Sequence, residues 1–343
     1  MADKRDPVAD LKRIAFLLEV MQEPGYRVRA FQSAATTLAE MPAREVADRA
    51  ATGRLRELAG IGEVTERTIL ESLRGEVPVY LRRLEATEGK PLAEGASELR
   101  AALKGDLHTH TDASDGHATM SDMAAAAVEL GHEYLVISDH SPRLTIANGL
   151  STERLMFQLD EIAALNRELA PFRLLSGIEV DINEDGSLDQ EPDVLSRLDV
   201  VVGSVHSELR MAAPQMTRRM VTAVANPNLD VLGHCTGRRR NRRMDRPEST
   251  FDAEIVFAAA ARFDKAVEIN CLPERLDPPK RLLRLAIEAG CRVAIDSDAH
   301  GLGQLGWLTT GCERAHLCGV TEPMIVNALP ADELLAWTAS HDT

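Results

Sequence analysis

The sequence of 343 residues is poor in aromatic side chains and in cysteine, and it lacks an excess of positive charge. Aromatic residues make up 3% of the chain, and the five cysteines lie in its last third without a CxxC pair. This pattern favours neither a disulfide framework nor a zinc knuckle, and it suits a reducing cytoplasm. The formal net charge of −15 argues against a protein that coats nucleic acid or an anionic membrane through its overall charge.

Long hydrophobic runs are also missing. No apolar stretch approaches the roughly 18 residues that a membrane-spanning helix needs, and the N-terminus is charged from its third residue. We therefore expect a cytoplasmic protein with no membrane partner. Hydrophobic residues still make up 44% of the chain and charged residues 27%, a balance that allows a sizeable core. The length favours one large domain and one small one.

Residues 1–86 are predicted to form a small all-α domain. Asp6 and Pro7 are typical of a helix start, and the apolar residues that follow repeat at helical spacing. A second helix is expected over about residues 27–41, and a third begins at Pro42.

A helix-hairpin-helix is expected next, in the segment LRELAGIGEVTERTILESL. Two helices would flank a tight turn at Gly60, Ile61 and Gly62. Backbone N–H groups at the start of the second helix could then bind a phosphate of one DNA strand. Residues 1–90 carry 15 basic and 15 acidic side chains, so net charge would not help, and a structural or protein-docking role is the alternative. Residues 87–103 are interpreted as a linker that leads into a short helix.

Over residues 104–343 the pattern changes to short apolar runs separated by helical stretches. The seven runs read GDLH, EYLVIS, RLLSGIE, DVVVGSV, DVLGH, AVEIN and RVAID. This alternation predicts an α/β fold in which parallel strands form a (β/α) barrel. The tail after His300 predicts two helices and no eighth strand. Active sites of such barrels form at the carboxyl ends of the strands, so the residues that follow each run matter most.

Side chains of metal-ligand type follow six of the seven predicted strands, and only the sixth ends otherwise, in Glu268 and Asn270. Six of the ten histidines are among these candidates, and histidines with unrelated packing roles would not follow the strand rhythm. The nine candidate ligands are His108, His110, Asp115, His140, Glu179, His206, His234, Asp298 and His300.

Histidine and carboxylate ligands together suit Zn²⁺, Mn²⁺ or Fe²⁺. Nine ligands are too many for one tetrahedral or octahedral ion, so two or three divalent ions are expected. Two ions bridged by a carboxylate suit phosphoester hydrolysis, in which an activated water attacks phosphorus. Ser114, Ser138 and Cys235 are weaker alternatives as nucleophiles, because no Gly-x-Ser-x-Gly elbow or Gly-rich phosphate loop accompanies them.

The segments GDLHTHTDASDG, SGIEVDINEDGSLD, VLGHCTGR and SDAH resemble the polymerase and histidinol phosphatase (PHP) domain, in particular the C-terminal PHP domain of bacterial family X DNA polymerases. The similarity covers about residues 104–337 and implies a distorted (β/α)7 barrel of the PHP type with three metal ions. By this resemblance, one ion would lie among His108, His110, Glu179 and Asp298, a second among Glu179, His206 and His234, and a third among Asp115, His140 and His300.

The first domain resembles the N-terminal helix-hairpin-helix domain of the same polymerases, over about residues 6–86. Those polymerases carry a nucleotidyltransferase palm where this chain has only the linker, so polymerase activity is excluded. Relatives with deoxyribose-phosphate lyase activity use a lysine in the helix after the hairpin. Thr68 stands at about that place and residues 63–73 contain no lysine, so lyase activity is not expected.

An arginine-rich run, GRRRNRRMDRP, has its first arginine four residues after His234. Guanidinium groups make paired contacts to phosphate oxygens. Arg238 and Arg242 in this run, and Arg275 after the sixth strand, match arginines of the family and are predicted to bind substrate phosphate. A solvated surface loop is the alternative.

These features predict a metal-dependent phosphoesterase that acts on DNA ends, as a 3′→5′ exonuclease or in 3′-end processing during DNA repair. The barrel would hydrolyse a phosphodiester or phosphomonoester bond, and the small domain would bind DNA. The alternative enzyme is a small-molecule phosphomonoesterase of the histidinol-phosphate or nucleotide phosphatase type. A non-catalytic DNA-repair adaptor is less expected, because a binding module would not need nine metal ligands.

Overall fold

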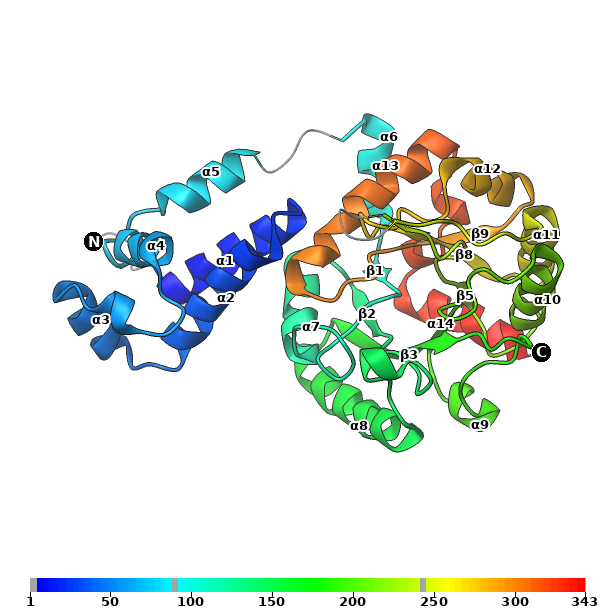
Figure 1. Ribbon diagram of the computed structural model, residues 1–343, viewed down its shortest axis with the longest axis horizontal. Coiled ribbons are helices and arrows are strands. Elements are labelled where there is room, and N and C mark those ends of the chain that lie inside the picture. The colour runs from blue at the N-terminus through cyan, green and yellow to red at the C-terminus, as the bar shows by residue number, and fades with distance from the viewer. Residues whose placement is uncertain (1–4, 88–91, 241–244, 343) are drawn as a thin grey trace. The chain divides into compact units, whose positions relative to one another are not determined.

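The computed structural model describes residues 5–87, 92–240 and 245–342, and the chain forms two compact units, Met1–Pro91 and Leu92–Thr343 (Figure 1). Within the segment interpreted as a linker, residues Glu94–Ala102 form helix α6, which belongs to the second unit. No helix in the described ranges combines the length and hydrophobicity needed to cross a membrane.

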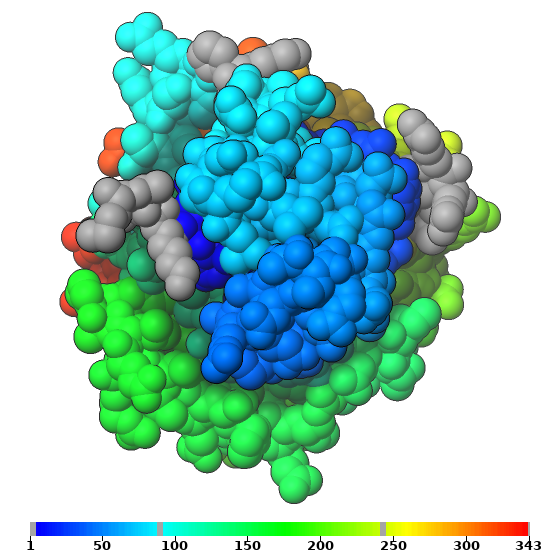
Figure 2. Space-filling model, turned by 90° about the vertical axis from the view of Figure 1, so that its left-hand side faces the viewer, coloured from blue at the N-terminus to red at the C-terminus, as the bar shows by residue number. Residues whose placement is uncertain are grey.

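The first unit is helical, as expected, and Figure 2 shows its surface in blue to cyan. Its α-helices are α1 (Pro7–Val20), α2 (Gly25–Ala39), α3 (Ala43–Ala51), α4 (Glu63–Leu73) and α5 (Val79–Thr87). Asp6 caps α1 by accepting a hydrogen bond from the Val8 N–H at 2.9 Å, as the sequence predicted. The apolar face of α1 packs against α2, α4 and α5, and its residues Leu11, Ile14 and Leu17 are fully buried.

The prediction of a helix directly before the turn at Gly60, Ile61 and Gly62 is wrong. Residues Leu55–Glu57 form only a single 3₁₀ turn. Gly53 and Gly60 both adopt left-handed backbone conformations, with φ of 67° and 78°, so the stretch between them is too short for two helical turns. The second helix is confirmed as α4, which begins after Gly62, where the Thr65 hydroxyl accepts the Gly62 N–H at 2.9 Å.

The second unit contains the predicted seven-stranded parallel sheet, in the order β1-β2-β3-β4-β5-β8-β9. An isolated parallel bridge between Thr109 and Ala299 links its two edges and nearly closes the sheet into a barrel. The strands are β1 (Gly105–Asp106), β2 (Tyr134–Ile137), β3 (Arg173–Asp181), β4 (Val200–Ser204), β5 (Val231–Leu232), β8 (Ala266–Asn270) and β9 (Arg292–Asp296). Almost every strand residue is buried, which explains why the strands read as continuous apolar runs.

Helices cover the outside of these strands in Figure 1. They are α7 (Met120–Glu129), α8 (Thr152–Leu169), α9 (Pro192–Leu195), α10 (Ala213–Val224), α11 (Ala253–Arg262), α12 (Lys280–Glu288), α13 (Leu308–Cys318) and α14 (Ala331–Ala339). The last two are the helices predicted after His300. Helix α6 packs against α13, where Leu99 and Leu103 join the apolar cluster of Leu308 and Cys312.

Candidate metal centre

All nine candidate ligands lie at the carboxyl ends of the barrel strands, and the structure brings them into one group of contacting side chains. Parallel strands present their carboxyl ends at one edge of a sheet, so residues far apart in the sequence meet there. Glu179 belongs to β3 itself, and its backbone forms a bridge with that of His140. The remaining ligand candidates follow β1, β2, β4, β5 and β9.

Glu179 lies at the middle of the group and is 1% exposed. Five imidazoles surround its carboxylate. Oε1 is 2.8 Å from His234 Nε2 and 3.2 Å from His206 Nε2. Oε2 lies 2.8 Å from His140 Nδ1, 3.3 Å from His108 Nε2 and 3.6 Å from His110 Nε2. A single carboxylate that faces five imidazoles is placed to bridge more than one cation.

Asp298 forms a second buried carboxylate of the group, held in a left-handed conformation with φ of 55°. Its Oδ1 is 3.4 Å from His110 Nε2 and 3.9 Å from His108 Nε2. Its Oδ2 is 3.2 Å from Arg275 Nε and accepts a hydrogen bond from Asn270 Nδ2 at 3.0 Å. Oδ1 of Asp298 therefore faces the histidines, while Oδ2 contacts Arg275 and Asn270, which are not candidate metal ligands.

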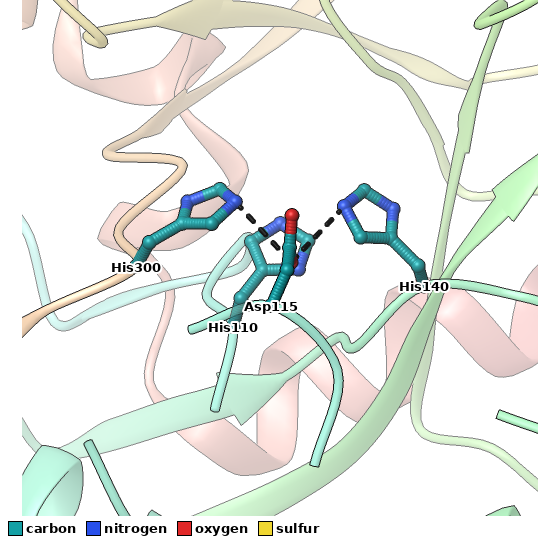
Figure 3. A group of neighbouring side chains, drawn as sticks. All are labelled: His110, Asp115, His140 and His300. Carbon is teal, nitrogen blue, oxygen red and sulfur yellow. Dashed lines mark ion pairs between the residues drawn. The ribbon is translucent and has the colours of Figure 1, made fainter. Parts of the chain in front are cut away.

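Asp115 forms the more open side of the group, with its side chain 35% exposed. Figure 3 shows His140 and His300 on opposite sides of this carboxylate, with His110 behind it. Both Nε2 atoms, of His140 and of His300, lie 3.5 Å from Asp115 Oδ1. Solvent or a substrate therefore has access from this side, whereas Glu179 is enclosed.

The inner imidazoles leave buried nitrogens without hydrogen bonds, which is the state expected of ligands. An unsatisfied buried polar group costs about 1–3 kcal/mol, and a cation would satisfy several of these atoms at once. Such nitrogens, within the ranges the structure describes, are His108 Nε2, His110 Nδ1 and Nε2, His140 Nδ1, His206 Nδ1 and Nε2, and His234 Nδ1.

Among the residues that the structure describes, three overlapping sets of side chains are close enough to hold one ion each. The sets are His108, His110 and Glu179; His140, Glu179 and His206; and His110, Asp115, His140 and His300. The first and third correspond to ion sites implied by the family resemblance, the first without Asp298 and the third with His110 added. The second contains His140 where the resemblance implies His234, although His234 Nε2 also contacts Glu179. The residues present therefore fit divalent cations.

In the metal-free site, the buried carboxylates and imidazoles shift one another's pKa values strongly. Burial opposes the charged forms of Glu179 and His108, yet their mutual attraction lowers the pKa of Glu179 and raises the pKa of His108, each well beyond its usual range. His206 behaves like His108: burial lowers its pKa, but Glu179 raises it to about 9. Burial lowers the pKa of His110 to about 3, and the neighbouring His300 adds to this effect. Protons on some imidazoles thus balance the carboxylates in the absence of ions.

Several contributing residues were not predicted as part of the site. Glu268 and Asn270 end β8 and contact the candidate ligands His108 and Asp298. Like the candidate ligands, these two polar residues lie at the carboxyl end of a strand, and this position is the sequence signal that could have identified them. Asp139 adjoins His140 and accepts hydrogen bonds from the Thr111 N–H and side chain, Ser114 Oγ and Gln158 Nε2, which hold the loop that carries Asp115.

The alternative nucleophiles occupy structural positions. Ser114 Oγ donates to Asp139 at 2.5 Å, and Ser138 Oγ donates to the Thr109 carbonyl at 3.1 Å. Burial raises the pKa of the Cys235 thiol well above its usual range, so it stays protonated. Ser114, Ser138 and Cys235 are therefore poorly placed to act as nucleophiles, and the carboxylates and imidazoles are the groups available for chemistry at this site.

The three arginines predicted to bind phosphate have different surroundings. Arg275 is buried beside Asp298, and its Nη1 makes no hydrogen bond. Arg238 donates to the backbone carbonyls of Arg275 at 2.7 Å and Leu276 at 2.5 Å, so it braces this loop. Arg242 lies outside the described residues.

Part of the arginine-rich run forms a two-stranded ribbon. An antiparallel ribbon pairs β6 (Arg239–Arg240) with β7 (Asp245–Arg246). Arg239 forms an ion pair with Glu274 at 2.8 Å, and Arg240 lies 3.6 Å from Asp245. The described part of the run is therefore a ribbon with ion pairs on both strands.

Comparison with known proteins gives two family matches. Residues 106–270 match the PHP domain family, and residues 2–77 match a helix-hairpin-helix domain family. The DNA polymerase/3′-5′ exonuclease PolX of Bacillus subtilis (strain 168) is 37% identical over 240 residues, 70% of this chain and 42% of that protein. The chain thus spans less than half the length of this relative.

Two further similarities concern phosphatases. A probable phosphatase of Thermoanaerobacter sp. (strain X514) is 28% identical over 234 residues, 65% of this chain and 89% of that protein. A crystal structure of histidinol phosphate phosphatase from Lactococcus lactis subsp. lactis Il1403, complexed with zinc, L-histidinol and phosphate, matches with a TM-score of 0.45 and 16% identity. That match covers 64% of this chain and 94% of the phosphatase.

Proposed function

This chain is a PHP-domain protein with an N-terminal helix-hairpin-helix domain, and from this premise we propose that it is a metal-dependent phosphoesterase that processes DNA ends. The reaction would be 3′→5′ exonuclease cleavage or removal of 3′-terminal groups. The observation that carries the proposal is the enclosure of the Glu179 carboxylate by five imidazoles. All five cysteines lie in the described ranges, free and buried, which supports a cytoplasmic location.

We assign two or three divalent ions, of zinc, manganese or iron, to the nine candidate ligands. Bound ions would polarise the phosphoryl oxygens and activate water. Glu179 and Asp298 would bind the cations at the buried side of the site. Asp115, His140 and His300 would hold an ion at the more exposed side, where a substrate phosphate could approach it. Arg275 would fix Asp298 through the 3.2 Å contact and add positive charge.

The action on DNA ends is supported by the presence of a helix-hairpin-helix domain in the same chain and by the 3′-5′ exonuclease activity in the name of the Bacillus relative. A panel of substrates on metal-reconstituted protein tests it, with labelled single-stranded and 3′-recessed oligonucleotides beside small phosphate esters. Release of mononucleotides or of 3′-phosphate supports the proposal. Activity confined to small esters would contradict it.

A small-molecule phosphomonoesterase is the second candidate. It is favoured by the probable phosphatase that matches this chain over 89% of its own length. It also fits the absence of net charge in residues 1–90, which gives that segment no electrostatic attraction for DNA. In this case the same panel would show turnover of phosphomonoesters and none of oligonucleotides.

Gly62→Asp is expected to weaken binding of 3′-recessed DNA roughly five- to thirtyfold at low salt. An added carboxylate at the start of α4 would repel a phosphate bound by the N–H groups there, an effect of about 1–2 kcal/mol. The fold should tolerate the change, because a Cβ at Gly62 would meet no atom within 4 Å and aspartate is a favourable N-cap. Fluorescence anisotropy measures the affinity.

Gly62→Asn is the matched control, since it adds a side chain of the same size without charge. It should bind DNA nearly as well as the wild type. Equal affinities of the wild type and Gly62→Asp would show that this turn does not contact DNA.

Arg275→Ala is expected to lower phosphoesterase activity about 10- to 100-fold with unchanged metal content, because it would remove the proposed contact with the substrate phosphate, and a hydrogen bond to a charged group contributes about 1.5–3 kcal/mol. Steady-state rates and metal analysis measure the two quantities. Arg292→Ala is the control, since it breaks an arginine–carboxylate pair with Asp264 at the amino end of β9. Loss of metal in Arg275→Ala would instead indicate a structural role.

A further inference from the structure

Glu268 is a fully buried carboxylate at the carboxyl end of β8, and it is not one of the nine candidate ligands. Its Oε1 lies 2.6 Å from His108 Nδ1. Its Oε2 accepts hydrogen bonds from the His234 backbone N–H at 2.5 Å and from Asn270 Nδ2 at 3.2 Å. Both oxygens are therefore used, and they reach candidate ligands that follow two other strands, β1 and β5.

The contact with His108 has a chemical consequence. A neutral imidazole has one N–H and one lone pair, and the partner of one nitrogen decides where the hydrogen lies. A hydrogen on Nδ1, donated to Glu268, leaves the lone pair on Nε2. That Nε2 makes no hydrogen bond and lies 3.3 Å from Glu179 Oε2, on the side of the candidate ions.

His108 differs in this respect from its neighbours His110 and His234. In both of those residues the second ring nitrogen, Nδ1, is buried without a hydrogen-bond partner. Among these three enclosed histidines, only His108 has its outer nitrogen on a carboxylate. The contact with Glu268 therefore fixes the orientation of the His108 ring, whereas no such contact fixes the rings of His110 and His234.

We propose that Glu268 is a positioning residue that holds His108 with its Nε2 lone pair directed at the metal ions. Asn270 extends the same support, because its Nδ2 also donates to Asp298 Oδ2 at 3.0 Å. Two residues of one strand thus brace groups that follow β1, β5 and β9. The proposal rests on the metal centre assigned above. Hydrogen-bond partners of metal-bound histidines generally orient the ring and raise its basicity.

The carboxylate is required because both oxygens accept hydrogen bonds. In Glu268→Gln, one acceptor would be replaced by an N–H₂ donor. If this donor faced His108, the hydrogen of the neutral ring would move to Nε2, which could then not bind an ion. If it faced His234, two donors would oppose each other. Either arrangement disturbs the centre without removing a ligand.

The test uses Glu268→Gln in the full-length chain, with Asp230→Asn as the matched control. Asp230 is also a buried barrel carboxylate, but it precedes β5 and contacts the Val201 N–H and His341. Competition with a chelator measures the affinity for Mn²⁺ or Zn²⁺. We expect roughly 10- to 100-fold weaker binding of at least one ion in Glu268→Gln and wild-type binding in Asp230→Asn.

A second measurement needs no metal. In NMR spectra of the metal-free protein with ¹⁵N-labelled histidine, the His108 Nδ1–H should give an exchange-protected, downfield signal, whether the ring is neutral or charged. Glu268→Gln should shift or remove this signal, whereas Asp230→Asn should retain it. If the wild type bound no metal, the proposed metal centre would fail, and this signal would still decide on the contact with His108.

The proposal is overturned if folded Glu268→Gln keeps wild-type metal affinity, or if the His108 signal is unchanged. A wild-type spectrum without a protected His108 Nδ1–H would also overturn it. Equal losses of affinity in Glu268→Gln and Asp230→Asn would indicate a general effect of buried charge and would likewise contradict a positioning role.

Discussion

Glu179→Gln is expected to lower phosphoester hydrolysis by about three orders of magnitude or more and to remove bound metal. The substitution takes the negative charge from the one carboxylate that faces five imidazoles. Charge stabilisation by metal ions contributes several kcal/mol to such reactions, and each 1.4 kcal/mol corresponds to a factor of ten in rate. Steady-state assays on oligonucleotides and small esters, together with metal analysis, measure the effect.

Glu168→Gln provides the control for this variant, because it makes the same chemical change at an exposed site on α8. It should retain the wild-type rate and metal content. Wild-type metal content in Glu179→Gln, with a rate reduced less than tenfold, would show that the catalytic centre lies elsewhere.

Removal of the ions is expected to make stability fall as the pH rises from 6.5 to about 9. In the metal-free protein, burial lowers the pKa of His206, but Glu179 and Asp181 raise it to about 9 from an ordinary value of 6.5. The folded state therefore binds this proton more tightly than the unfolded state. The resulting stabilisation, about 3 kcal/mol, is complete below pH 6.5 and is lost as the pH rises through the folded-state pKa. His108, whose pKa is also raised, acts in the same direction.

The melting temperature of the chelator-treated protein should thus fall by roughly 5–10 °C between pH 6.5 and 9. The metal-loaded protein should show a smaller decrease, because its imidazoles bind ions instead of protons. Thermal unfolding followed by circular dichroism measures both. His206→Asn should reduce the pH dependence of the metal-free form, and identical pH profiles with and without metal would contradict the assignment of His206 as a ligand.

Most of the fold could be predicted from local patterns. Strands such as Val200–Ser204 are buried on both faces and read as apolar runs, and the start of α1 depends on Asp6 and Pro7 within one turn. Only the first helical segment of the hairpin was predicted wrongly, because its conformation depends on two left-handed glycines, Gly53 and Gly60. A Cβ at Gly60 would come within 3.0 Å of Ser33 Cβ, which is a contact with another helix that local sequence does not reveal.

The sequence by itself determined the candidate ligands, because a parallel barrel places all carboxyl ends of its strands at one edge, whatever the detailed packing. Tertiary structure alone decided which candidate ligands meet at one carboxylate, that Arg238 donates to backbone carbonyls, and that Glu268 contacts His108. Glu268 and His108 are 160 residues apart in the chain. A hydrogen bond between them depends on strand register and on side-chain positions within a few tenths of an ångström. The spacing of residue types along the sequence predicts neither.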